Sequence, residues 1–81
     1  MTPVELQLNT AVQHLVTTAR AKAYYKDDYA RIAELLDRAD HLCNLAREGV
    51  ADVRLARILD ETAMQFPECS RAILTGVTPN S

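Results

Sequence analysis

The feature that most constrains the fold is a helical pattern in the middle of the chain, over residues 27–49. Apolar residues recur there at spacings of three and four, the period of one face of an α-helix. Two such stripes lie side by side: one holds Tyr29, Ile32, Leu36, Ala39, Cys43 and Ala46, and the other holds Ile32, Leu35, Ala39, Leu42 and Ala46, with Leu45 at its edge. Two adjacent stripes need a neighbour on each side, so we expect this helix, residues 28–48, at the centre of a bundle. The opposite face is polar and predicts a solvent-exposed surface: Arg31, Glu34, Asp37, Arg38, His41 and Asn44.

An earlier helix is predicted over residues 2–25. Thr2 and Glu5 have the spacing of a capping box, and Pro3 stands at the first helical position, where its missing N–H costs nothing. No glycine or proline lies between Pro3 and Gly49, so the sequence leaves two possibilities. Aspartates at positions 27 and 28 favour a break there, because aspartate caps a helix N-terminus well. A single long helix is the alternative, and it would need a partner chain to cover its apolar side.

Two further helices are expected after Gly49, which suits the left-handed position that ends a helix. An apolar stripe predicts a third helix over residues 51–66, with Val53, Ala56, Leu59, Ala63 and Phe66 inside and Leu55, Ile58 and Met64 beside them. The short connection at residues 49–51 predicts that the second and third helices form an antiparallel hairpin. Pro67 ends the third helix and opens a short fourth one over residues 67–75. We therefore expect one all-α bundle over residues 1–76 and a flexible tail over 77–81.

Length and charge limit the possible functions. A chain of 81 residues with 48% hydrophobic residues forms one small domain. Domains of this size bury only about 60–65% of their unfolded surface, so association adds useful stability. The 9 basic and 11 acidic residues argue against a dedicated DNA-binding domain, which usually carries a basic excess. The sequence shows no signal peptide and no apolar run long enough to span a membrane. We therefore expect a cytoplasmic protein that does not associate with a membrane, with Cys43 and Cys69 as reduced thiols.

No motif predicts catalysis, a cofactor or a bound metal. The possible metal ligands His14, His41, Cys43 and Cys69 do not follow any known ligand spacing. Cys69 lies near a helix N-terminus, which makes it the more reactive thiol of the two, but no base accompanies it in sequence. We therefore expect a non-enzymatic protein.

The first helix carries an unusual polar face. Glu5 is the only charged residue between Met1 and Ala19, and the remaining polar positions hold glutamine, asparagine, histidine and threonine. Neutral groups cost less to bury than charged ones. One interpretation is an ordinary solvent face; the other is a helix that lies between chains. The second predicts a homo-oligomer, most simply a dimer, with these residues at its interface: Leu8, Val12, Gln13, Leu15 and Thr17.

A basic and tyrosine-rich stretch follows at residues 20–26. Cations bind phosphates and tyrosines stack on bases, which predicts a possible ligand or partner contact at Arg20, Lys22, Tyr24, Tyr25 and Lys26. Alternatively, Tyr25 and Tyr29 cover the core while the cations extend over it. The sequence thus favours a self-associating helical protein–protein interaction module, a small regulator, inhibitor or adaptor. The alternative is a nucleotide or nucleic-acid binding protein that uses residues 20–26.

Overall fold

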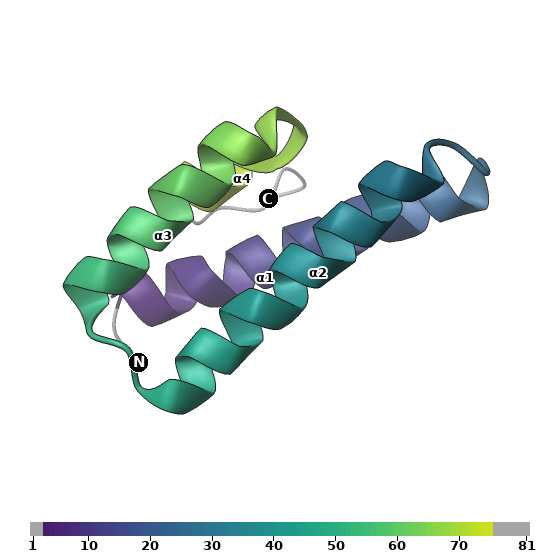
Figure 1. Cartoon of the computed structure of the whole chain (residues 1–81). Helices are drawn as coiled ribbons and strands as arrows, with labels where there is room; N and C mark the ends of the chain where they lie inside the picture. The colour runs from purple at the N-terminus through teal and green to yellow at the C-terminus, as the bar shows by residue number, and fades with distance from the viewer. Residues whose placement is uncertain (1–2, 76–81) are drawn as a thin grey trace.

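The computed structural model describes residues 3–75, and over this range the chain is a bundle of helices without a strand (Figure 1). Its elements are α1 (Pro3–Tyr24), α2 (Tyr29–Glu48), α3 (Asp52–Gln65), a short 3-10 helix η1 (Pro67–Cys69) and α4 (Ser70–Thr75). The all-α prediction is confirmed, and the helices lie close to the predicted ranges. The predicted cap at Thr2 and the predicted tail at 77–81 lie outside the described residues.

The predicted break between the first two helices is confirmed, and the single long helix is wrong. Lys26 and Asp28 adopt positive φ angles of 53° and 42°, which turn the chain back on itself. The Asp28 carboxylate accepts a hydrogen bond of 3.1 Å from the Arg31 backbone N–H and so caps α2. At the other end of α2, Gly49 takes the left-handed conformation with φ 71°, as predicted.

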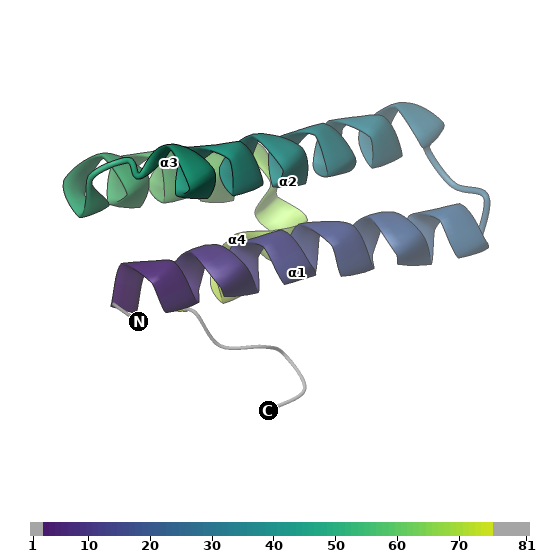
Figure 2. The same ribbon diagram turned by 90° about the horizontal axis from the view of Figure 1, so that it is seen from below.

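The central helix is α1, so the prediction that placed residues 28–48 at the centre is wrong. α1 packs against α2, α3, η1 and α4, whereas α2 packs closely along α1 and not along α3. In Figure 2, α1 and α2 run side by side in front of α3 and α4. The close hairpin predicted for the second and third helices is not confirmed. The connection between α2 and the end of α3 is made by long side chains: Arg31 and Arg38 of α2 donate hydrogen bonds to Gln65.

One core joins all four α-helices. Its members are Leu8, Ala11, Leu15 and Ala19 of α1, Leu35, Ala39, Leu42 and Leu45 of α2, and Leu55, Leu59, Ala63, Phe66, Cys69 and Ile73 from the second half. The predicted stripe of Leu35, Ala39 and Leu42 is thus buried. Gln7 adds a polar link, because its Nε2 donates to the Ile73 carbonyl at the end of α4 over 2.6 Å.

Several residues predicted in or beside the core are exposed instead. Val53 and Met64 of α3 are each 82% exposed, and Ala46 of α2 also faces solvent. Tyr29 and Leu36 of the other predicted stripe are 63% and 44% exposed. For α2 the reason is that only one helix packs closely along it, so within residues 3–75 the stripe with Tyr29 and Leu36 is left partly uncovered. No helix within residues 3–75 combines the length and hydropathy needed to cross a membrane.

Candidate interaction surface

One side of the α1–α2 pair carries exposed apolar side chains, among them Tyr29 and Leu36. Arg31 and Arg38 mark the side of α2 that faces α3 and η1. By the helical period of 3.6 residues, Leu36 and Tyr29 lie on a different side of α2, turned away from α3. The side of the α1–α2 pair turned away from α3 is called the open face below. By the helical period, its apolar residues are Val12 and Val16 of α1 and Tyr29, Ile32, Leu36 and Cys43 of α2.

Part of the open face is hollowed. One depression lies between α1 and α2 and is lined by Leu8, Asn9, Val12, Gln13, Cys43, Ala46 and Arg47. A second adjoins it where α2 passes into α3 and is lined by Glu5, Leu8, Asn9, Ala46, Gly49, Val50, Asp52 and Leu55. The two share Leu8, Asn9 and Ala46, so they form one continuous depression, called the end hollow below. It lies at the end of the open face where α1 begins and α2 finishes.

The structure divides the predicted self-association residues into two groups. Val12, Gln13 and Thr17 lie on or beside the open face, with Gln13 and Thr17 exposed. Leu8 and Leu15 are only 3% and 0% exposed, because the chain's own helices cover them. Leu15 is therefore internal to the described chain, and Leu8 is reached only through the end hollow.

The predicted basic and tyrosine residues lie around the turn between α1 and α2, far from the end hollow. Tyr24 and Tyr25 are 80% and 77% exposed, and their rings meet edge to face with centroids 5.0 Å apart. The interpretation that Tyr25 and Tyr29 cover the core is wrong. Arg20 and Lys26 are exposed, whereas Lys22 is half-buried and close enough to Glu68 to lower the pKa of that carboxyl. The five residues therefore do not form a single basic cluster.

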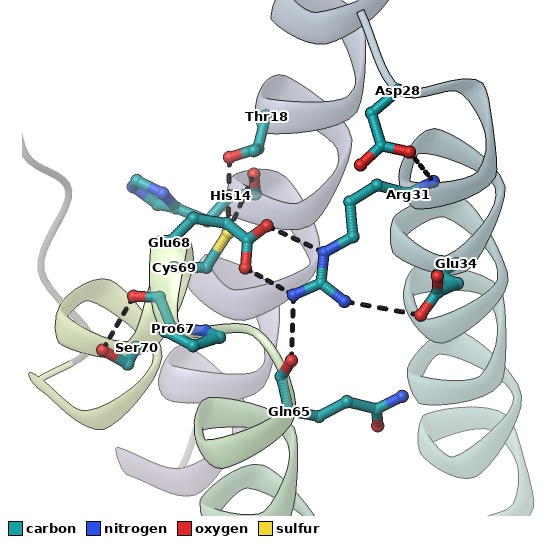
Figure 3. Close-up of polar contacts among 10 residues, drawn as sticks. All are labelled: His14, Thr18, Asp28, Arg31, Glu34, Gln65, Pro67, Glu68, Cys69 and Ser70. Carbon is teal, nitrogen blue, oxygen red and sulfur yellow. Dashed lines mark hydrogen bonds and ion pairs between the residues drawn. The ribbon is translucent and has the colours of Figure 1, made fainter.

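An arginine-centred network, which sequence reasoning missed, holds η1 against α2 (Figure 3). The Arg31 guanidinium donates to both carboxylate oxygens of Glu68, over 2.9 and 2.7 Å, and to the Gln65 carbonyl over 2.9 Å. It also lies 4.4 Å from the centre of the Phe66 ring and 3.4 Å from Glu34. Arg31 and Arg38 were predicted to face solvent. Their partners Gln65 and Glu68 lie at least 27 residues away along the chain, and no local pattern signals such a pairing.

The two titratable groups of η1 respond to this environment in opposite ways. The paired hydrogen bonds from Arg31 lower the pKa of Glu68, so its carboxylate is the stable form. Burial raises the pKa of the Cys69 thiol, which is 2% exposed and lies 3.3 Å from the Thr18 hydroxyl. Cys69 is therefore a buried structural thiol and not the more reactive cysteine that its position near a helix N-terminus suggested.

Changing Glu68 to glutamine is expected to lower the free energy of unfolding by about 1–2 kcal/mol at pH 7, because a charge-assisted bidentate pair is lost at a site that is only partly exposed. Since folding lowers the pKa of Glu68, the stabilisation is fully present above the ordinary glutamate pKa of about 4.3 and declines as the pH falls below it. Urea melts at pH 7 and pH 3 measure this, and the difference between the variant and the unmodified protein should be smaller at pH 3. Glu61→Gln, on the exposed side of α3, is the matched control and should have no effect at either pH. A difference for Glu68→Gln that is equal at both pH values would exclude the ion pair as its cause.

No protein-family model, no curated protein and no solved structure matches this chain. The open face, the end hollow and the tyrosines at the turn are therefore the features from which function is argued.

Proposed function

We propose that this chain is a non-enzymatic helical interaction module that associates with a second copy of itself through the open face, and acts as a small regulator, inhibitor or adaptor. One observation carries the proposal: Tyr29 and Leu36 on α2 are 63% and 44% exposed, and with the half-buried Ile32 and Cys43 they form an apolar stripe that residues 3–75 cover only in part. Val12 and Val16 of α1 extend this stripe sideways across the groove between the helices. When the open faces of two copies meet, α1 and α2 of each copy together form a four-helix bundle, a common way to bury apolar helix surfaces.

The polar groups of the open face suit a second copy. Gln13 and Thr17 are neutral and can be buried with hydrogen bonds at lower cost than charged groups. The charges around the face are of both signs, with Arg20 and Arg47 against Asp40. A face with balanced charges complements its own copy when the two are suitably aligned, and does not attract a polyanion as a uniformly basic face would.

The exposed area predicts a modest affinity. Burying the exposed parts of Leu36 and Tyr29 contributes about 1–2 kcal/mol for each side chain. Two copies supply four such side chains, and Val12, Val16 and Ile32 add to them. Association costs roughly 4–15 kcal/mol in lost freedom of motion, which offsets most of this gain, so a weak dimer is expected and not a tight one.

Light scattering tests the proposal directly. At about 100 μM the unmodified chain is expected to scatter as a dimer, twice the 9.0 kDa of one chain. Leu36→Asp places a charge in the middle of the open face and should give the monomer. Gln13→Glu should weaken the dimer less, because Gln13 lies at the rim. Val53→Asp is the matched control, since Val53 is also apolar and exposed but lies on α3, and it should leave the dimer intact. A 9.0 kDa species for the unmodified protein, or equal effects of Leu36→Asp and Val53→Asp, would refute the proposal.

A second candidate function is binding of a nucleotide or a nucleic acid at residues 20–26. Its support is the exposure of Tyr24 and Tyr25, whose ring faces are accessible to a base. Against it, Asp27 and Asp28 lie beside the same turn and Lys22 faces Glu68. Nucleotides and oligonucleotides that change the amide spectrum of the protein in a salt-dependent way would favour this second function.

A further inference from the structure

The open face has a projection at one end and a depression at the other. Tyr29 and Arg47 are separated by 47 − 29 = 18 residues, which is five turns of 3.6 residues, so both lie on the same line along α2. Tyr29 begins α2, directly after the turn that follows Tyr24 and Tyr25, and these three tyrosines at one end of the helix pair are called the tyrosine tip. Arg47 lines the end hollow. Tip and hollow therefore belong to one face.

The two ends match in shape and hydropathy. The rings of the tyrosine tip are 63–80% exposed, and burying aromatic rings of this size is a strong source of binding energy. The end hollow has an apolar floor of Leu8, Val12 and Cys43 and a rim of polar groups. In two copies related by a two-fold axis, the projection of each copy can fill the depression of the other. Both contacts form together, because a two-fold interface uses the same surface on both copies.

The charges at the two ends also match. Beside the tip, Asp27 and Lys26 are exposed. The end hollow is lined by one cation, Arg47, and by two carboxylates, Glu5 and Asp52. In an antiparallel alignment, Asp27 of one copy lies near Arg47 of the other, and Lys26 lies near Asp52 of the other. In a parallel alignment, each charged residue lies near the same residue of the other copy. Like charges in direct opposition are unfavourable, so the antiparallel alignment is preferred.

We infer that two copies pack antiparallel, with the tyrosine tip of each copy seated in the end hollow of the other. Leu36 lies midway between Tyr29 and Cys43, seven residues from each, and is therefore placed on the two-fold axis against the same residue of the second copy. This alignment rests on the proposed self-association and adds to it the identity of the surfaces that meet. A monomeric protein would contradict both the proposed self-association and this alignment. A dimer with another alignment would contradict only the alignment.

Cross-linking tests the alignment. In the antiparallel dimer, residue 29 of one copy lies over residue 43 of the other, while the two copies of Cys43 are separated by about 21 Å along the helix, at 1.5 Å per residue. Tyr29→Cys treated with a short bis-maleimide should therefore give a covalent dimer that joins position 29 to Cys43, identified by peptide mass spectrometry. The unmodified chain and Tyr29→Cys combined with Cys43→Ser should give none. Cys69 is 2% exposed and does not compete.

Charge exchange provides a test that leaves the tyrosines in place. Arg47→Asp and Asp27→Arg should each weaken the dimer by about three- to tenfold, and the double variant should return to within about twofold of the unmodified protein. Light scattering over a concentration series measures the dimer constants, and circular dichroism confirms that each variant is folded. Links from position 29 to 29 or from Cys43 to Cys43, or single effects that simply add in the double variant, would overturn the antiparallel alignment. Protection of Tyr29→Cys from the reagent by an oligonucleotide, with no 29–43 link in its absence, would assign the tip to nucleic acid instead.

Discussion

Phe66→Ala is expected to cost about 3–5 kcal/mol of the free energy of unfolding, the range for removing a large buried aromatic side chain. Phe66 is fully buried and sits where α3 ends and η1 begins, beneath the Arg31 guanidinium. Its loss opens a cavity and also removes the ring on which Arg31 rests. A domain of this length has roughly 4–12 kcal/mol of stability in total, so the variant should lose at least about a quarter of its free energy of unfolding.

Urea denaturation followed by circular dichroism measures this effect. Met64→Ala is the matched control, because Met64 lies two residues away but is 82% exposed, and it should cost no more than about 0.5 kcal/mol. If the two variants lose similar amounts, α3 does not pack with the side that carries Leu55, Leu59 and Phe66.

The second large effect is expected at Leu42 of α2. Leu42→Ala should cost about 2–4 kcal/mol, because Leu42 is 0% exposed within the core between α1 and α2. Leu36→Ala removes the same atoms from the same helix, but Leu36 is 44% exposed, so its cost in a dilute sample should be about 1 kcal/mol or less. Comparing two identical substitutions on one helix isolates the effect of burial.

The concentration dependence separates the two leucines further. In the proposed dimer Leu36 becomes buried, so the melting temperature of the unmodified protein should rise with concentration and that of Leu36→Ala should rise less. The deficit of Leu42→Ala is a property of the single chain and should not depend on concentration. Equal losses for both leucines in dilute samples would contradict the orientation of α2 described above.

The helices themselves follow from local chemistry and could be predicted from the sequence. The break at Asp28 depends on a side chain that caps the next turn, and the end of α2 depends on Gly49 in a left-handed conformation. Pro67 ends α3 because the residue before a proline disfavours the helical conformation. Each of these signals acts over three or four residues, which is the range over which a sequence can be interpreted directly.

The arrangement of the helices depends on contacts between distant residues, and there the sequence was insufficient. The apolar stripes of α2 indicated two neighbours, yet within residues 3–75 only α1 packs closely along it. An apolar stripe predicts that a helix surface is buried, but it does not identify the helix that buries it. The same limit applies to α1. The sequence could indicate that one side of this helix, with Val12, Gln13 and Thr17, lies at a surface, but it could not predict that the chain's own helices cover Leu8 and Leu15.

By itself the sequence determined the helix boundaries, the all-α class and the presence of more apolar helix surface than a small chain readily covers. The tertiary structure alone decided that α1 is central, that Arg31 binds Glu68 37 residues away, and that Tyr29 and Leu36 are left exposed on the open face. The physical reason is that hydrophobic burial has no direction: it requires apolar residues to leave water, but the choice of partner depends on the shapes and lengths of elements that meet only after the chain has folded.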